Sequence, residues 1–101
     1  MTGIQQIAAE RRRQQRKEHW TAEHDDQHRS GQLAVAAACY AVNKGVMPVA
    51  VLTIGERDAW PWDKVWDKRR KHDRIRSLQI AGALIAAELD RLKRAAKGEG
   101  P

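Results

Sequence analysis

The sequence predicts a mostly all-α fold: a compact domain of three to four helices with a long C-terminal helix, a tryptophan-rich loop and one short extended segment. Apolar residues near the C-terminus repeat at the spacing of one helical face, and a second run, residues 32–43, is rich in alanine. We expect residues 1–97 to form a single helical domain, small enough to gain from a second subunit. Residues 98–101 are expected to be a fraying tail.

The N-terminal helix is expected to begin after Thr2, whose hydroxyl can cap it, and to continue to about residue 19. Its apolar stripe is narrow, and arginine and glutamine fill the remaining positions. Residues 20–31 follow as a polar connection. Because Thr21 is a good helix cap, we expect a short helical turn within it.

The alanine-rich run predicts a second, mostly buried helix that ends near Asn43. The residues that share one face of it are Leu33, Ala36, Ala37, Tyr40 and Ala41. Residues 46–54 favour an extended backbone, because Pro48 opposes helix continuation and β-branched residues follow. Residues 55–66 then form a loop, and another helical turn is expected within 63–71.

The clearest prediction is a C-terminal helix over residues 73–96. Its apolar residues alternate in steps of three and four, which is the heptad seam of a packed helix. The seam residues are Ile75, Leu78, Gly82, Ile85, Leu89, Leu92 and Ala96. We expect other helices, from the same chain or from a second copy in a homo-oligomer, to cover this seam. Glycine at position 82 predicts close approach by a neighbouring helix.

The chain carries a formal net charge of +6 and has a sequence pI near 10.0, which favours an anionic partner. The basic residues gather at 11–17 and at 68–76. Such runs are also typical of ordinary solvated helix faces. The single cysteine, Cys39, cannot form an internal disulfide, and we expect it in the core of a cytoplasmic protein. No apolar run is long enough to predict a membrane span or a secretion signal.

Several short motifs are spread over nearly the whole chain: Ile7-Ala8-Ala9-Glu10-Arg11 with Gln14, Trp20-Thr21, Glu23 to His28, Gly31-Gln32-Leu33-Ala34, Ala37, Tyr40-Ala41, Trp60-Pro61-Trp62, Trp66, and Ala81 to Leu92. In this combination the chain resembles a family of short phage and prophage proteins whose biochemical role is undefined. The resemblance implies action in the host cell cytoplasm, with host modulation or counter-defence as a specific form of it.

A second resemblance is to the MazG-like all-α nucleotide pyrophosphohydrolases. It rests on Glu10, Arg11 and Gln14, which form a Glu-Arg-x-x-Gln stretch, and on a following tryptophan. Those enzymes hold Mg²⁺ with carboxylates one helical turn apart. In this chain arginine stands three positions after Glu10 and three positions after Glu88, where those enzymes have the second carboxylate of each pair. Both carboxylate pairs are therefore incomplete. The resemblance therefore implies nucleotide binding without a metal site.

One polar cluster suggests a divalent metal site, because two histidines four residues apart share a helical face beside carboxylates. Its members are Glu23, His24, Asp25, Asp26 and His28. The alternative is structural: the two aspartates cap a helix or pair with arginines, and the histidines are hydrogen-bonded loop residues. No other cofactor is expected.

A second candidate surface combines indole rings with cations, a pattern that can stack on bases and hold phosphates. The candidate ligand-binding residues are Arg11, Trp60, Trp62, Lys68, Arg69 and Arg70. The same indoles can instead cover a small core that has no phenylalanine.

The function that these patterns favour is that of a non-enzymatic accessory protein, a homo-oligomer that presents a basic face to an anionic partner. The partner would be a nucleotide, a nucleic acid or a host protein. Two alternatives remain. One is a metal-dependent nucleotide hydrolase built on the 23–28 cluster with Glu10 or Glu88 in support, and the other is a sequence-independent nucleic-acid-binding protein whose affinity falls steeply with salt.

Overall fold

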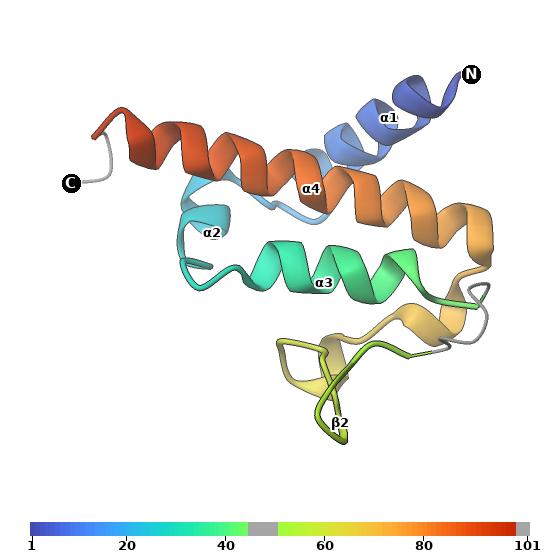
Figure 1. Ribbon diagram of the computed structural model, residues 1–101. Coiled ribbons are helices and arrows are strands. Elements are labelled where there is room, and N and C mark those ends of the chain that lie inside the picture. Colours follow the sequence, from blue (N-terminus) through green and yellow to red (C-terminus); the bar gives the residue numbers. More distant parts are fainter. Residues whose placement is uncertain (45–50, 99–101) are drawn as a thin grey trace.

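The computed structural model describes residues 1–44 and 51–98, and it confirms the mostly helical fold (Figure 1). Four α-helices are present in these ranges: α1 (Gly3–Arg16), α2 (Ala22–Asp26), α3 (Gln32–Ala41) and α4 (Arg74–Ala96). Two short 3₁₀ helices, η1 (Lys64–Trp66) and η2 (Arg69–Lys71), precede α4. Strands β1 (Thr53–Ile54) and β2 (Arg57–Asp58) pair in an antiparallel ribbon.

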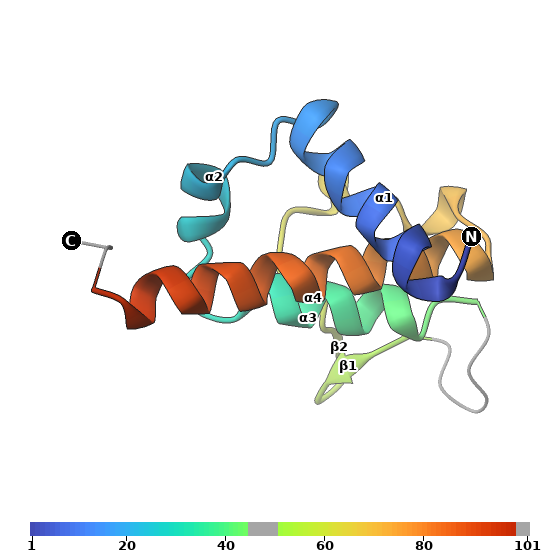
Figure 2. The ribbon, with the colours of Figure 1, turned by 90° about the horizontal axis from the view of Figure 1, so that it is seen from above.

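Helix α4 runs the length of the molecule, and the other elements are arranged around it. Figure 1 shows α3 lying beside α4, with the β-ribbon projecting below α3. Seen from above, α1 crosses the first half of α4 at an angle, and α2 lies near its second half (Figure 2). The tryptophan-rich connection passes on the same side of α4 as α2. Side chains from α1, α2, α3, α4 and the 60–72 segment line one cavity.

Short polar side chains cap the helices where the sequence predicts it. The Gln5 amide N–H donates to Thr2 Oγ1 at 3.2 Å, and the Thr2 amide N–H donates to Gln5 Oε1 at 2.8 Å, which completes a capping box. Thr21 Oγ1 accepts from the His24 amide at 3.2 Å and starts α2. Helix α1 ends at Arg16, short of residue 19, and the backbone of His19 adopts a left-handed φ of 59°.

The core lies between α3 and α4. Its buried residues are Leu33, Ala36, Ala37, Tyr40, Ile80, Ala81, Leu84 and Ala87. The buried face predicted for the alanine-rich helix is confirmed, with Ala41 partly buried at its edge. Because four of these eight residues are alanine, the two helices can approach closely, and Leu33 and Leu84 are the largest apolar side chains that are fully buried.

The structure confirms the predicted position of α4. One of the two predicted ways of covering its seam, by helices of the same chain, is wrong. The large seam residues are exposed: Ile75 65%, Leu78 44%, Ile85 52%, Leu89 58% and Leu92 49%. In the two described ranges, other helices therefore leave these five large residues exposed, and α1 covers only Gly82. The packed face instead contains Ile80 and Leu84, since alanines beside them let α3 and α1 lie against that side. Gly82 is a close approach as predicted, because a Cβ there would lie 2.5 Å from Ile7 Cδ1 of α1.

The connection between α3 and α4 is held by side chains at the end of α3. The Asn43 amide donates to the Arg69 carbonyl at 2.9 Å and to Ser77 Oγ at 2.8 Å. The Arg74 guanidinium donates to the carbonyls of Ala41 and Asn43, which are left unpaired at a helix C-terminus. The predicted extended segment 46–54 lies in part outside the described residues, and its described end contributes Thr53 and Ile54 to the exposed ribbon. Among the described residues, no helix has the length and apolarity needed to cross a membrane.

Candidate functional site

A cavity of about 780 Å³ lies between α1, α2, α3, α4 and the 60–72 segment. This volume falls within the range of small-molecule pockets, roughly 300–1,000 Å³. Buried apolar side chains from α3 and α4, among them Leu33, Ile80 and Leu84, form part of its lining. All four tryptophans of the chain also line it: Trp20, Trp60, Trp62 and Trp66.

Aromatic rings form a continuous series along the wall of the cavity. Trp20 stacks on His24 with ring centroids 5.5 Å apart and an interplanar angle of 7°. The series continues by edge and tilted contacts: His24 to His28 at 5.2 Å, His28 to Trp62 at 5.0 Å, Trp62 to Trp60 at 5.5 Å, Trp60 to Tyr40 at 5.7 Å and Tyr40 to His72 at 6.4 Å. These separations are those of favourable aromatic pairs. Each ring is therefore held in place by its neighbours.

A buried ion cluster lies at the α1 side of the cavity. Glu10 is 4% exposed and accepts hydrogen bonds from Arg13 Nε at 2.8 Å and Nη2 at 3.0 Å. Arg76 Nη1 of α4 lies 2.7 Å from Glu10 Oε1. Burial by itself raises the pKa of the Glu10 carboxyl, but the hydrogen bonds from the two guanidinium groups outweigh it and leave the pKa below its ordinary value. Glu10 is thus a fixed negative charge between two cations.

Two polar atoms in the cavity lining are buried without a hydrogen-bond partner among the described residues: Gln14 Oε1 and Trp62 Nε1. The orientation of the Gln14 amide is set by Glu10, because Nε2 donates to the carboxylate at 3.2 Å and a carboxylate can only accept. Oε1 is therefore the free end. An unpaired buried acceptor or donor costs about 1–3 kcal/mol. Both atoms are shielded from the open space of the cavity, and Gln14 as a whole is 0% exposed.

Two lysines line the cavity beside the aromatic series. Lys68 and Lys71 are exposed, and neither forms an ion pair within residues 1–44 and 51–98. The cations nearer the floor, Arg13 and Arg76, are already paired with Glu10. The lysines are therefore the cations available to an anionic group of a ligand.

The predicted ligand-binding residues fall into two groups. Trp60, Trp62 and Lys68 line the cavity. Arg69 does not, because its guanidinium donates to Asp67 at 2.6 Å and Asp58 at 2.8 Å and lies 5.1 Å from the centre of a Trp60 ring. Arg69 therefore packs on the Trp60 ring without lining the cavity itself. Arg70 is exposed outside the cavity lining.

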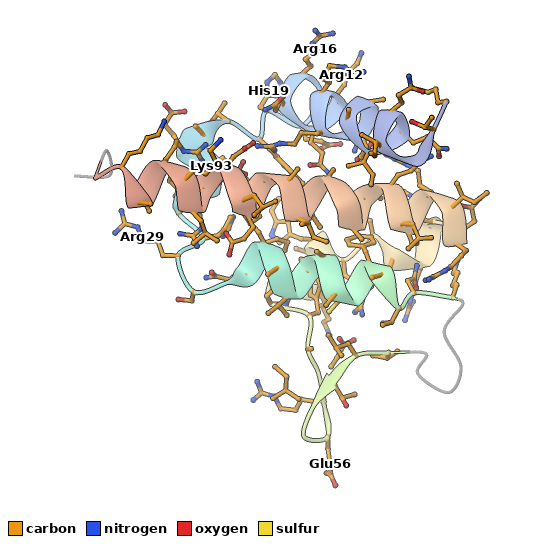
Figure 3. All side chains as sticks on the ribbon, turned by 45° about the horizontal axis from the view of Figure 1, so that its top comes forward. Arg12, Arg16, His19, Arg29, Glu56 and Lys93 are labelled. Carbon is orange, nitrogen blue, oxygen red and sulfur yellow. The ribbon has the colours of Figure 1, made fainter. Side chains whose placement is uncertain are left out.

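The basic run 11–17 is divided between the inside and the outside of the molecule. Arg12 and Arg16 are exposed and project from α1 away from the other helices (Figure 3). Arg11 is instead turned inward, where its Nη2 donates to Asp25 Oδ2 at 2.9 Å. This candidate ligand contact is therefore part of the helix packing and does not line the cavity.

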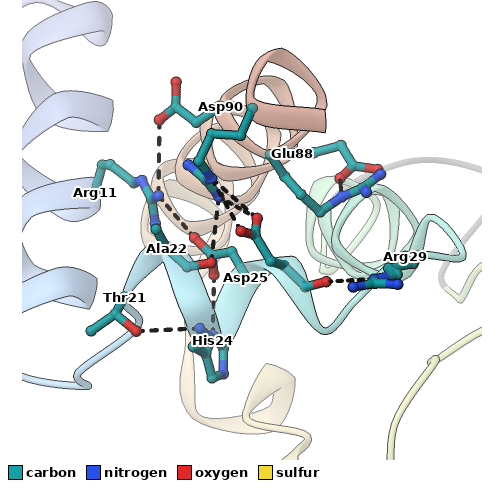
Figure 4. A network of polar contacts seen from close by, with 11 residues as sticks. Arg11, Thr21, Ala22, His24, Asp25, Arg29, Glu88 and Asp90 are labelled. Carbon is teal, nitrogen blue, oxygen red and sulfur yellow. Dashed lines mark hydrogen bonds and ion pairs between the residues drawn. The ribbon is translucent and has the colours of Figure 1, made fainter. Parts of the chain in front are cut away.

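The 23–28 cluster is not assembled as a metal site. Asp25 is fully buried between Arg11 and His24 Nδ1, which lies 3.1 Å from Oδ1 (Figure 4). Asp26 turns the other way and pairs with Arg94 of α4 at 2.7 Å, and Glu23 is exposed. Within the two described ranges no three His, Cys, Asp or Glu side chains are grouped to hold an ion. What the structure does bring together is His24 and His28, both facing the cavity.

Two of the cavity histidines are shifted towards their neutral form. Burial lowers the pKa of His28, and the neighbouring His24 adds to the effect. Burial likewise lowers the pKa of His72, assisted by Arg76 and Lys71. Burial also raises the pKa of the Tyr40 hydroxyl to about 12. At neutral pH the series of rings is therefore uncharged at these positions.

We expect the free energy of unfolding to fall as the pH drops from about 7.5 to about 5.5. The unfolded chain protonates His28 and His72 near the ordinary value of 6.5, whereas the folded protein protonates them only at lower pH, so acid favours unfolding. Urea unfolding at the two pH values measures this. The double variant His28→Gln, His72→Gln should show a flatter pH profile.

The matched control for this experiment is His19→Asn, since His19 is exposed and asparagine accepts its left-handed backbone. The lowered pKa of the Glu10 carboxyl affects stability only below its ordinary value of 4.5, outside the window. An unchanged profile in the double histidine variant would contradict the assignment.

Several cavity residues are not evident from the sequence. Glu10, Arg13 and Gln14 belong to a helix that looks solvated, and Arg76 joins them from the far end of the chain. The only local signal is the spacing of three between Glu10 and Arg13, which permits an ion pair on one helix. Tyr40 and His72 also enter the site through tertiary packing.

The comparisons with known proteins identify no relative: no family model, no curated protein and no solved structure matches this chain. The resemblances to short phage proteins and to MazG-like pyrophosphohydrolases therefore stay predictions.

Proposed function

We propose that this protein binds a small, planar, anionic ligand of the nucleotide class in the cavity between α1, α2, α3 and α4. The observation that carries the proposal is the aromatic wall. Trp20, Trp60 and Trp62, with the histidines and Tyr40 between them, present ring faces and edges to a single cavity. Stacking of a base on an aromatic side chain is worth about 1–3 kcal/mol.

The position of the lysines supports an anionic ligand. Lys68 and Lys71 belong to the same segment as Trp62 and Trp66, so a ring held by the indoles places its substituents near ammonium groups. Phosphate oxygens accept hydrogen bonds from such groups. A neutral heterocycle would leave these lysines without a role.

The two unpartnered polar atoms support a heterocycle over a simple aromatic ring. Gln14 Oε1 needs a donor, and Trp62 Nε1 needs an acceptor. Nucleobases carry both kinds of group on their edges, whereas a plain phenyl ring carries neither. A base would meet both atoms once the Gln14 and Trp62 side chains turn towards the cavity, and it would then be favoured over an analogue that leaves either atom unpaired.

The test is a fluorescence titration of the purified protein with nucleoside triphosphates and with the corresponding nucleosides. Because every tryptophan lines the cavity, binding should quench or shift the intrinsic emission in a saturable way. The double variant Lys68→Gln, Lys71→Gln should raise the Kd for a triphosphate about tenfold, which is about 1.4 kcal/mol. Its Kd for the nucleoside should change little, because the nucleoside has no phosphate.

The matched control is the double variant Lys64→Gln, Lys97→Gln, which removes the same charge from exposed positions outside the cavity lining. Equal weakening in both double variants would show that only net charge matters, and would contradict the cavity as the binding site. The proposal also fails when none of the triphosphates changes the emission at millimolar concentration.

A further inference from the structure

The exposed seam of α4 is an apolar surface with no partner in the described part of the chain. Five large aliphatic residues, 44–65% exposed, recur on one side of the helix from Ile75 to Leu92. With Gly82 included, the spacing alternates between three and four residues. Gly82 itself is covered by Ile7 of α1. This is the pattern of a helix that packs against another helix.

Helix α3 extends this surface. None of its ten residues, Gln32–Ala41, is charged. The side of α3 that is not packed on α4 carries small apolar residues, with Ala34 exposed and Ala38 and Val42 partly exposed. Figure 1 shows α3 and α4 side by side over the length of α3. A surface helix normally carries polar residues on its outer side, so this face is unusual for solvent contact.

We infer that a second copy of the chain covers this face, and that the two α4 helices pack in antiparallel orientation. In one register Ile75 meets Leu92 of the partner subunit, and Leu78 meets the partner's Leu89. At the centre the partner's Ile85 meets Ile7 of α1, because Ile7 already covers Gly82. Each large residue of the seam then faces another large aliphatic residue.

The helix dipoles favour the antiparallel orientation, because they oppose each other in such a pair. The charges along α4 select no orientation. Its first turn carries Arg74 and Arg76, and its second half carries Glu88 and Asp90 together with three basic residues, Arg91, Lys93 and Arg94.

The available area is sufficient for a dimer. From Ile75 to Leu92 the seam is about 26 Å long at 1.5 Å per residue. Together with α3, about 10 Å away, it forms a face on the order of 500 Å² per copy. A pair of such faces reaches about 1,000 Å², the lower range of specific protein interfaces.

The dimer would leave the ligand cavity free. Ile80 and Leu84 face the cavity from the opposite side of α4 to the seam. This inference is thus independent of the proposed nucleotide binding, and a monomeric variant should retain the ligand affinity of the wild type.

The first test is the oligomeric state, measured by sedimentation equilibrium at several concentrations. Wild type should be a dimer, and Ile85→Lys or Leu89→Lys should raise the dimer Kd at least about thirtyfold while the far-ultraviolet circular dichroism is unchanged. The controls are Ile54→Lys and Val65→Lys, since both residues are 67% exposed and lie outside the seam. A monomeric wild type at about 100 μM, or equal dissociation by the controls, would overturn the inference.

The second test addresses orientation. Leu78→Cys and Leu89→Cys proteins are treated separately and as a mixture with a short bifunctional maleimide. The native Cys39 is fully buried and leaves the background low. Cross-linking should appear mainly in the mixture, because position 78 faces position 89 of the other copy. Efficient cross-linking of each variant with itself would mean a parallel pair and would reject the proposed arrangement.

Discussion

Asp25→Ala is expected to lower the free energy of unfolding by about 3 kcal/mol, which corresponds to a fall in Tm on the order of 15 °C. Asp25 is fully buried, and its two carboxylate oxygens pair with Arg11 Nη2 at 2.9 Å and His24 Nδ1 at 3.1 Å. The Arg11 side chain is 11% exposed, and its Nε and Nη1 have no partner among the described residues. Removal of Asp25 would leave this guanidinium charge buried with only Asp90, 3.9 Å away, to compensate.

The neighbouring Asp26→Ala is the matched control. Asp26 also pairs with an arginine, Arg94 at 2.7 Å, but both side chains are partly exposed and water can replace the contact. We expect a much smaller change in Tm. The double variant Arg11→Met, Asp25→Leu should recover most of the stability lost in Asp25→Ala, because it removes both buried charges. Equal losses for Asp25→Ala and Asp26→Ala, by thermal unfolding, would mean that the buried pair has no special role.

This ion pair also explains why the 23–28 cluster looked like a metal site. Its composition is that of a ligand set, but α2 is only five residues long and its side chains point in several directions. Asp25 points towards α1, Asp26 towards α4, and His24 and His28 towards the cavity. Spacing alone cannot predict which of these neighbours each side chain meets. The structural alternative, aspartates paired with arginines, describes the observed contacts.

The parts of the fold that the sequence predicts are those set by local interactions. Thr2 and Thr21 cap helices through backbone amides three residues away, and the buried face of α3 follows from the helical spacing of its apolar residues. The candidate site was partly predictable for a similar reason, since Trp60, Trp62 and Lys68 are close in sequence. Arg76 could not be found this way, because it meets Glu10 only when α1 crosses α4.

The heptad spacing of the α4 seam predicted that helices of the same chain or of a second copy cover it. The spacing does not tell which side of α4 packs within the chain. In this protein alanine allows α3 to approach closely, and alanine forms half of the core cluster. Helix α4 therefore has two apolar sides, one of mostly small residues that packs within the chain and one of large residues that remains exposed. A sequence pattern shows both apolar sides of the helix but does not tell which one packs within the chain.

The two sides can be compared directly with one substitution on each. Leu84→Ala should lower the free energy of unfolding by about 3 kcal/mol, because Leu84 is 1% exposed between α3 and the cavity and its truncation leaves a void. Leu89→Ala removes the same atoms from a side chain that is 58% exposed. At low protein concentration, where the chain is monomeric, we expect less than about 1 kcal/mol, measured by urea unfolding. At high concentration the Leu89→Ala loss should grow with formation of the proposed dimer, whereas the Leu84→Ala loss should not depend on concentration. A larger loss for Leu89→Ala than for Leu84→Ala at low concentration would mean that the seam packs within the chain after all.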